Sequence, residues 1–168
     1  MKYGQIRKMD IANGPGIRTS VFVTGCTHNC FNCFNKEYQN PNFGTDWTDA
    51  ETERIIGYLK EPAITGLTLL GGEPMQNTEG LIPVIEAVRK AVETNIWVYS
   101  GYVYEELVKD ASRKKLLSLC DVLVDGPFKE DLKDPGLFFR GSANQRVIAI
   151  PATLAAGEVN LPLPHGEI

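Results

Sequence analysis

The sequence lacks any apolar run of the eighteen or more residues that a membrane-spanning helix needs. Its first residues, MKYGQIRK, also lack the apolar core of a signal peptide. We therefore expect a cytoplasmic protein with no membrane partner. An excess of positive charge is missing as well, because the formal net charge is −4. This balance argues against nucleic acid as a partner.

Cysteines are few, and their placement is uneven. Of the four in 168 residues, Cys26, Cys30 and Cys33 lie within eight residues, whereas Cys120 stands alone. This is a poor pattern for a disulfide framework, and a cytoplasmic location would keep the thiols reduced. The clustered thiols indicate metal binding or redox chemistry instead. Cys120 follows several leucines and is most simply a small buried hydrophobic residue.

Short segments rich in β-branched and aromatic residues alternate with segments of helical periodicity. The predicted strands cover residues 18–24, 66–70, 96–99, 121–124 and 147–150. The predicted helices begin near Thr48, which has capping-box spacing to Glu51, and near Thr78; a third covers residues 103–119 with a break near Ser112. This alternation is typical of an α/β fold with a parallel sheet.

The length of the chain limits how much of a barrel it can form. A complete eight-unit β/α barrel needs about 250 residues, so we expect an open, partial parallel β/α barrel. We expect this single domain to cover residues 1–150. Residues 151–168 contain three prolines and no periodicity, and they are expected to form an irregular C-terminal tail.

Each of the first four predicted strands ends in a glycine-rich or polar turn. These turns are Gly25-Cys26, Gly71-Gly72-Glu73, Ser100-Gly101 and Asp125-Gly126. In parallel α/β folds the carboxyl ends of the strands form the mouth of the active site. We therefore expect the unusual residues to collect at one rim of the sheet.

The three clustered cysteines have the spacing C-x3-C-x2-C, so one loop can wrap around one inorganic centre. A [4Fe-4S] cluster is usually held by four cysteines. Three thiolates leave one iron without a protein ligand, and a substrate can bind a metal at an open coordination site. The alternative is a non-catalytic zinc-binding adaptor. Its further ligands would have to come from Cys120, His28 and His165, which do not form the usual second pair.

Residues 14–35 resemble the signature of radical-SAM enzymes that activate glycyl-radical proteins. Nine positions agree with the pattern G-x-G-x-R-x3-F-x2-G-C-x3-C-x2-C-x-N, and residues 71–74 resemble the GGEP element of the same superfamily. Four further segments are similar to the activating proteins of anaerobic ribonucleoside-triphosphate reductases: residues 10–16, 96–102, 121–126 and 140–146. The resemblance covers residues 3–148, fails after Pro151, and implies a fold of the radical SAM type.

The resemblance implies a specific reaction. A [4Fe-4S] cluster on Cys26, Cys30 and Cys33 would cleave S-adenosylmethionine reductively to a 5′-deoxyadenosyl radical. That radical would form a glycyl radical on the large subunit of the anaerobic ribonucleoside-triphosphate reductase. The electron would come from a small donor protein such as a flavodoxin. The cluster motif and GGEP alone would also permit a radical-SAM enzyme that acts on a different protein or on a small molecule.

The same resemblance suggests which residues contact S-adenosylmethionine. Gly71 and Gly72 lack side chains, which lets the strand approach the ligand closely. Backbone carbonyls there, and the Glu73 carboxylate, would meet the methionine ammonium. A plain strand-to-helix turn is the alternative for the double glycine.

Asn32, Cys33 and Phe34 lie where the family's cluster loop borders the adenine. Phe34 could equally be an ordinary core aromatic. Ser100 and Asp125 end two strands within reach of the ribose hydroxyls or the methionine end, although Asp125 could instead cap a turn.

The segment from Arg140 to Arg146 has two functional interpretations. Arg140 and the pair Asn144-Gln145 would either bind the carboxylate of the ligand or dock the partner protein. A solvated turn is the alternative, and the sequence leaves these interpretations open. We also expect the open side of a partial barrel to admit a glycine-bearing loop of the partner.

Overall fold

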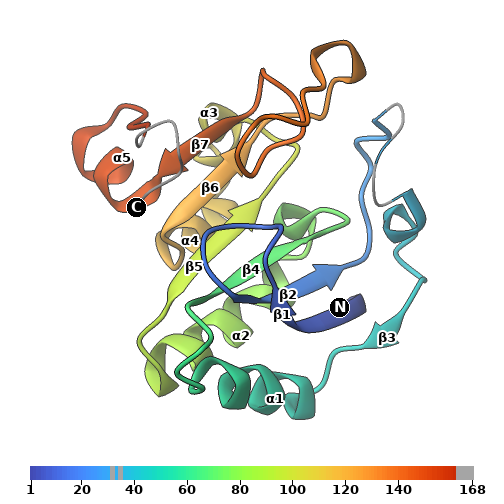
Figure 1. The fold of residues 1–168 in the computed structure, drawn as a ribbon, viewed down its shortest axis with the longest axis vertical. Coiled ribbons are helices and arrows are strands. Elements are labelled where there is room, and N and C mark those ends of the chain that lie inside the picture. The colour runs from blue at the N-terminus through green and yellow to red at the C-terminus, as the bar shows by residue number, and fades with distance from the viewer. Residues whose placement is uncertain (31–32, 34–35, 162–168) are drawn as a thin grey trace.

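The chain forms a seven-stranded sheet with helices packed on one face. This computed structural model describes residues 1–30, 33 and 36–161 (Figure 1). The strands are β1 (Lys2–Asp10), β2 (Arg18–Val23), β3 (Thr45–Asp46), β4 (Gly66–Gly71), β5 (Asn95–Tyr99), β6 (Val122–Asp125) and β7 (Arg146–Ala149). The α-helices are α1 (Asp49–Leu59), α2 (Thr78–Ala91), α3 (Tyr104–Leu107), α4 (Ala111–Ser118) and α5 (Ile150–Ala156). Short 3-10 helices are η1 (Lys36–Gln39), η2 (Pro74–Gln76) and η3 (Glu130–Leu132).

The strand order is β3-β1-β2-β4-β5-β6-β7. The four central strands β2, β4, β5 and β6 run parallel, as the sequence predicts. The outer strands β1, β3 and β7 pair antiparallel with their neighbours, so the sheet is mixed rather than wholly parallel. β1 was not predicted because its sequence, KYGQIRKMD, carries few β-branched residues. None of its residues before Asp10 is buried.

Side chains of the parallel strands alternate between the two faces of the sheet. One face carries Val21, Leu69 and Val98, which belong to the large core cluster formed with α1, α2 and α4. The opposite face carries Phe22 and Leu70, which form a separate, smaller cluster. Figure 1 shows the segment that joins β1 to β2 in front of this second face. The helices therefore leave one face of the sheet to loops.

The helix boundaries follow from local capping. Thr48 and Glu51 form the predicted capping box at the start of α1. The helix predicted to begin near Thr78 is α2, which starts at Thr78 and has Asn77 as its N-cap. The segment 103–119 divides into α3 and α4 before Ser112, because the Asp110 side chain accepts a hydrogen bond from the backbone of α4 and caps it.

The prediction of an irregular tail was wrong for residues 151–156, which belong to α5. Pro151 stands at the start of this helix, where proline is well tolerated, and Gly157 ends it in the left-handed conformation (φ 75°). Ile150 is fully buried in the large core cluster. The three prolines of residues 151–168 favoured the prediction of an irregular tail, although the helix itself contains only Pro151.

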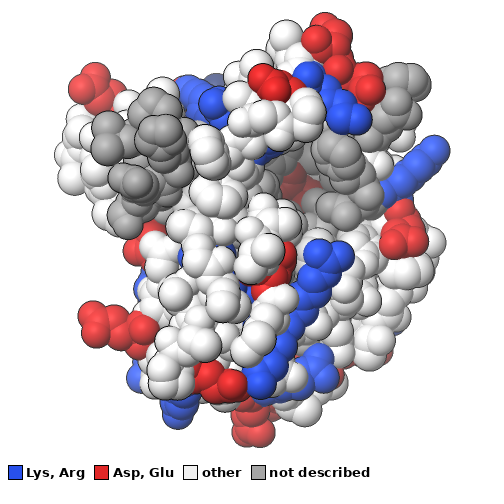
Figure 2. All heavy atoms as spheres, in the orientation of Figure 1, with Lys and Arg blue, Asp and Glu red and all other residues white. Residues whose placement is uncertain are grey.

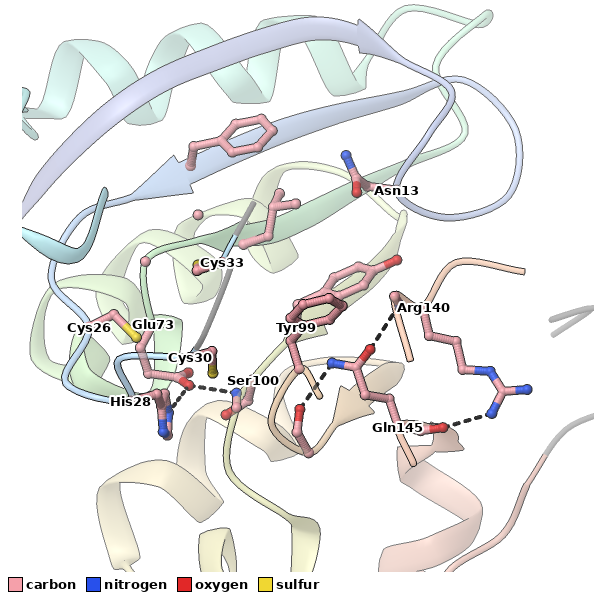
Figure 3. Close-up of a pocket in the computed structure, with 18 of the residues that line it drawn as sticks. Asn13, Cys26, His28, Cys30, Cys33, Glu73, Tyr99, Ser100, Arg140 and Gln145 are labelled. Atoms are coloured by element: carbon pink, nitrogen blue, oxygen red, sulfur yellow. Dashed lines mark hydrogen bonds and ion pairs between the residues drawn. The ribbon is translucent and has the colours of Figure 1, made fainter. Parts of the chain in front are cut away.

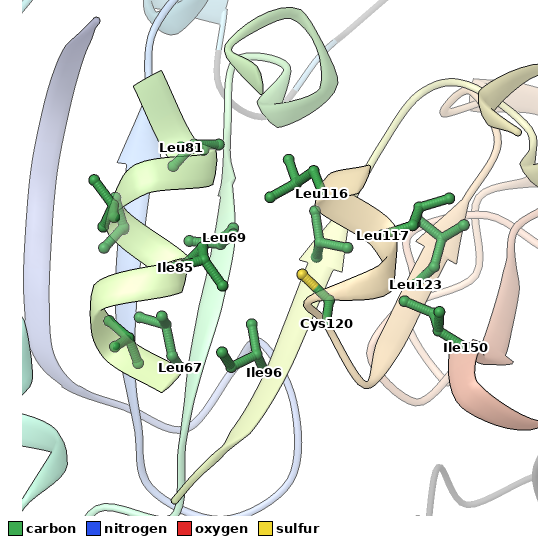
Figure 4. Packing of buried hydrophobic residues seen from close by; sticks show 14 of the residues in the cluster. Leu67, Leu69, Leu81, Ile85, Ile96, Leu116, Leu117, Cys120, Leu123 and Ile150 are labelled. Carbon is green, nitrogen blue, oxygen red and sulfur yellow. The ribbon is translucent and has the colours of Figure 1, made fainter. Parts of the chain in front are cut away.

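The core confirms the interpretation of Cys120 as a small buried hydrophobic residue. Its thiol lies among the side chains of α2, α4 and the central strands (Figure 4). Burial raises the pKa of this thiol to about 12. Within the described part of the chain, none of the helices combines the length and the apolar composition that crossing a lipid bilayer requires.

Candidate functional site

A cavity of about 440 Å³ lies on the face of the sheet that the helices leave open. Its floor includes Phe22, Leu70 and Tyr99, from three neighbouring parallel strands. Its walls come from the β1–β2 segment, the cysteine segment and the β6–β7 segment. Figure 2 shows a hollow in this face between the cysteine segment and the β6–β7 segment. Acidic and basic side chains are interspersed around the hollow. The hollow lies at the carboxyl ends of parallel strands, where α/β folds bind ligands.

The residues expected at one rim do come together there. Seven of the predicted site residues line the cavity: Cys26, Cys30, Cys33, Gly71, Gly72, Glu73 and Ser100. Figure 3 shows the three cysteines at one end of the cavity and Arg140 and Gln145 at the other. Asn32 and Phe34 lie outside the described residues, so their contact with adenine stays a prediction.

Backbone hydrogen bonds attach the cysteine segment to the end of the central sheet. After β4, the amide of Gly72 donates to the carbonyl of Val23 at 2.7 Å, and the amide of Glu73 donates to the carbonyl of Gly25 at 2.8 Å. A Cβ at position 72 would lie 2.7 Å from the Gly25 carbonyl oxygen. Glycine is therefore required at this position for the close approach of the cysteine segment itself.

The second edge of the cysteine segment is held by η1. The amide of Gly25 donates to the carbonyl of Tyr38 at 2.7 Å, and the amide of Cys26 donates to the carbonyl of Gln39 at 3.0 Å. The Tyr38 ring is itself buried against Phe22 of the cavity floor, with ring centroids 5.9 Å apart. The first cysteine is thus fixed between β4 and η1.

The three thiols fit an iron–sulfur cluster by their chemistry. They are free, half-buried and face one cavity. Each thiolate of a cubane binds its own iron, so the sulfur atoms need not converge on one point; among the described residues no three His, Cys, Asp or Glu side chains do so. Burial, with Glu73 and the other two cysteines, raises the pKa of Cys26 to about 11. Binding of iron at this thiol therefore displaces a proton.

The Glu73 carboxylate is engaged within the protein. It is 1 % exposed, and its Oε1 atom accepts hydrogen bonds from the Gly101 amide at 2.7 Å and from His28 Nε2 at 2.6 Å. Its Oε2 atom accepts from the Met75 amide at 2.9 Å and caps η2. Three donors of the chain itself therefore occupy the carboxylate that the resemblance in the sequence suggested for the methionine ammonium.

Ser100 and Asp125 end neighbouring strands but have different surroundings. The Ser100 hydroxyl faces the cavity and accepts a hydrogen bond from the Tyr102 amide at 3.1 Å. Asp125 is not among the residues that line the cavity. Its carboxylate is bound by Arg146 at 2.6 Å and by the Tyr104 amide at 2.8 Å. The structure therefore places Asp125 outside the cavity lining, with its carboxylate bound to the start of α3 and to Arg146 of β7.

The amides of Asn144 and Gln145 stabilise the segment between β6 and β7. Asn144 donates to the carbonyl of Pro127 at 2.7 Å, and Gln145 donates to the carbonyl of Gly126 at 3.0 Å. The Gln145 Oε1 atom accepts from the Gly141 amide. Arg140 lines the cavity, and its Nη1 atom donates to the backbone carbonyl of Gln145 at 2.7 Å. These contacts hold the segment over the cavity.

Reasoning from the sequence missed the aromatic part of the cavity. Tyr99 donates a hydrogen bond to the carbonyl of Phe139 at 2.6 Å, and the Phe139 ring packs edge-on against Trp97. Phe139 has a positive φ of 62°, which is unusual for a bulky residue. Alternation along β5 places Tyr99 on the face opposite Val98, and this signal could have identified it.

The chain is similar to known proteins over most of its length. Residues 12–148 match the protein family described as a 4Fe-4S single cluster domain. An anaerobic ribonucleoside-triphosphate reductase-activating protein of Escherichia coli K12 is 41% identical over 152 residues, which cover 88% of this chain and 97% of the relative. The protein with the same name from Enterobacteria phage T4 is 36% identical over 150 residues, 88% of this chain and 93% of the relative.

A relative of the same name from Haemophilus influenzae is 41% identical over 150 residues, which cover 86% of this chain and 96% of that protein. The chain therefore belongs to the 4Fe-4S single cluster domain family and, within it, to the anaerobic ribonucleoside-triphosphate reductase-activating proteins. The family resemblance found in the sequence is confirmed. This membership supports an enzyme with an iron–sulfur cofactor.

Proposed function

We propose that the chain uses a [4Fe-4S] cluster on Cys26, Cys30 and Cys33 to cleave S-adenosylmethionine reductively. One external electron, from a small donor protein such as a flavodoxin, breaks the bond between the sulfonium and the 5′ carbon, which releases methionine. The 5′-deoxyadenosyl radical takes a hydrogen atom from a glycine Cα of the large subunit of the anaerobic ribonucleoside-triphosphate reductase. The products are 5′-deoxyadenosine and a glycyl radical.

The observation that carries this proposal is the gathering of the three thiols with the Gly71-Gly72-Glu73 turn at one end of a single cavity. The cavity volume of about 440 Å³ falls within the range of small-molecule sites, roughly 300–1,000 Å³. When bound, the cluster supplies one-electron reduction at the end of the cavity where the thiols lie. We interpret the sheet, with its α-helices packed on one face, as the partial barrel of the radical SAM type.

The residues of the chain have three tasks in this proposal. The cysteine thiolates hold the cluster. Ser100 offers a hydroxyl to a polar group of S-adenosylmethionine, beside the backbone of Gly72. The apolar floor, formed by Phe22, Leu70 and Tyr99, excludes water from the reacting atoms.

A partner protein has access to the cavity because, among the described residues, loop segments rather than α-helices cover this face of the sheet. The exposed Ile11 side chain adjoins Ala12 of the cavity wall, and the exposed Phe138 adjoins the cavity residues Leu137 and Phe139. Apolar side chains at the edge of a site are typical of surfaces that bind proteins. This arrangement supports a protein loop as the second substrate.

An anaerobic cleavage assay tests the proposal. The protein is reconstituted with iron and sulfide, reduced with dithionite and mixed with S-adenosylmethionine. We expect methionine and 5′-deoxyadenosine in equal amounts, and a glycyl radical signal by EPR when the large reductase subunit is added. Cleavage without a radical on that subunit would favour a different protein or a small molecule as substrate. A colourless protein that binds only zinc would favour the adaptor.

Cys30→Ala is the matched test of the ligand assignment. We expect this variant to lose cleavage by at least about a hundredfold, because the cluster loses one of three protein ligands. Cys120→Ala is the control, since its thiol lies in the core away from the cavity. It should retain iron and cleavage. Retained cleavage in Cys30→Ala would refute the assignment.

A further inference from the structure

His28 lies inside the cysteine segment and has a defined place in the structure. Its side chain is 17% exposed and its Nε2 atom is 2.6 Å from Glu73 Oε1. A carboxylate only accepts hydrogen bonds, so the imidazole Nε2–H is the donor. This contact joins the cysteine segment, between Cys26 and Cys30, to the turn after β4.

The same carboxylate oxygen connects the cysteine segment to a second strand. Glu73 Oε1 also accepts from the Gly101 amide at 2.7 Å, directly after β5. Because Glu73 is 1% exposed, these hydrogen bonds lie in a region of low dielectric, where they are strong and costly to leave unmade. One oxygen atom therefore fixes His28 relative to the ends of both β4 and β5.

The imidazole fits between Gly101 and Tyr102. A Cβ at position 101 would lie 2.6 Å from His28 Cδ2, so the ring occupies space that only a glycine leaves free. The Tyr102 ring packs against the imidazole edge-on, with ring centroids 4.5 Å apart. The site thus matches the imidazole in shape as well as in hydrogen bonding.

Tyr102 is itself held in place. Its hydroxyl accepts hydrogen bonds from Gln76 at 3.0 Å and from Arg113 at 3.2 Å. The Arg113 guanidinium lies over the Tyr102 ring at 4.2 Å and also donates to the carbonyl of Met75. The wall behind the imidazole is therefore rigid.

We propose that His28 is a positioning residue that acts through Glu73 and sets the stability and exposure of the cluster bound by the neighbouring cysteines. Glu73 serves the cysteine segment in this role and does not contact the methionine ammonium. Partners that orient metal ligands without touching the metal strongly affect metal affinity. This inference deepens the proposed function and rests on the presence of the cluster at Cys26, Cys30 and Cys33.

The test measures iron retention in the reconstituted protein, independently of catalysis. A colorimetric chelator of ferrous iron is added anaerobically, and the rate of iron loss is recorded. We expect His28→Ala and Glu73→Gln each to lose iron at least about tenfold faster than the wild type. Because both changes weaken the same contact between His28 and Glu73, the double variant should lose iron no faster than the faster single variant.

Two further variants separate this role from a general loss of structure. His28→Gln should restore slow iron loss in part, because its side-chain amide can donate to Glu73. Thr27→Ala is the matched control, since it removes one exposed hydrogen bond of the same segment and leaves His28 intact. It should retain iron like the wild type. The EPR spectrum of the reduced cluster should change in His28→Ala and not in Thr27→Ala.

The contrary result is equally specific. If His28→Ala retains iron and its EPR spectrum while Glu73→Gln loses only affinity for S-adenosylmethionine in equilibrium dialysis, Glu73 contacts the ligand and the inference is wrong. Equal rates of iron loss in His28→Ala and Thr27→Ala would also overturn it. If the wild type takes up no iron, the proposed function fails together with this inference, so the two failures are distinguishable.

Discussion

At Cys26, burial favours the protonated thiol, whereas metal binding requires the thiolate. A thiolate binds iron, yet burial together with Glu73 and the other cysteines raises the pKa of Cys26 to about 11. Without metal the thiol therefore stays protonated at neutral pH. The positive charge of bound iron reverses this balance, because a coordinated thiol is deprotonated outright. The site is thus suited to a cationic centre and disfavours a free thiolate.

Alkylation of the iron-free protein tests this property. A pKa near 11 lowers the thiolate fraction about a hundredfold relative to an ordinary thiol, while the higher basicity recovers part of the nucleophilicity, so Cys26 should react about tenfold more slowly at pH 8. The rate should rise with pH up to about 11. Mass spectrometry of peptides labelled with iodoacetamide gives this rate. A plateau already at pH 9 would contradict the assignment.

At the residue scale, the sequence predicted which side chains gather and less well what they do. Spacing and strand ends identified the cysteines, Glu73 and Ser100, because motif positions depend on local order along the chain. The partners of Glu73 and Asp125 were not predictable. They include backbone amides, the His28 imidazole and an arginine from distant segments, and only the three-dimensional fold brings these groups together.

The β6–β7 segment forms one wall of the cavity, and a hydrogen bond from Tyr99 attaches this segment to the sheet. Tyr99→Phe removes the hydrogen bond to the Phe139 carbonyl and leaves the aromatic ring in place. We expect a loss of about 1–2 kcal/mol in unfolding free energy, because a partly buried acceptor loses its donor. Hydrogen exchange of residues 137–141 should become faster. Unchanged exchange there would show that other contacts hold the segment.

The β1–β2 segment is shaped by Asp10. Burial would raise the pKa of this carboxyl, but hydrogen bonds from Ser20 and Asn13 and from the Ala12 amide outweigh burial and lower the pKa. A lowered folded-state pKa stabilises the protein at pH values above the unfolded value near 3.8, and this contribution is lost as the pH falls through the lower folded value.

Asp10→Asn isolates that contribution. The variant should be less stable than the wild type at pH 7 by about 1–3 kcal/mol, because it loses a charged acceptor of three hydrogen bonds. The difference should shrink as the pH falls below about 4, where the unfolded wild type begins to bind a proton that the folded carboxyl binds only at lower pH. Urea unfolding at several pH values gives both numbers. A difference that is independent of pH would show that the carboxylate charge is not responsible.

At the element scale, hydrophobic periodicity predicted the central strands and the main helices. It failed where an element carries little periodic signal. β1 is an outer strand without a continuous buried face, and α5 is a single short helix that begins with a proline. Such elements depend on neighbours that are already folded, so their own sequence gives little indication of them.

At the scale of the whole molecule, helices cover one face of the sheet and loops cover the other. The large core cluster stabilises the fold on the helical face, which leaves the opposite face to form a cavity between segments of irregular structure. The partial parallel barrel expected from the sequence captured the central strands, whereas β1, β3 and the antiparallel direction of β7 were not foreseen. Because one face of the sheet forms the core and the other forms the cavity, a chain of this length holds both a core and an open site.

We propose that three protein thiols hold a four-iron cluster and leave one iron free to bind S-adenosylmethionine. Mössbauer spectroscopy of protein loaded with the iron-57 isotope, before and after addition of S-adenosylmethionine, tests this most directly. We expect the signal of one iron in four to change while the other three stay unaltered. Four irons that all remain unchanged when S-adenosylmethionine is bound, or a protein that takes up no cluster, would contradict the account.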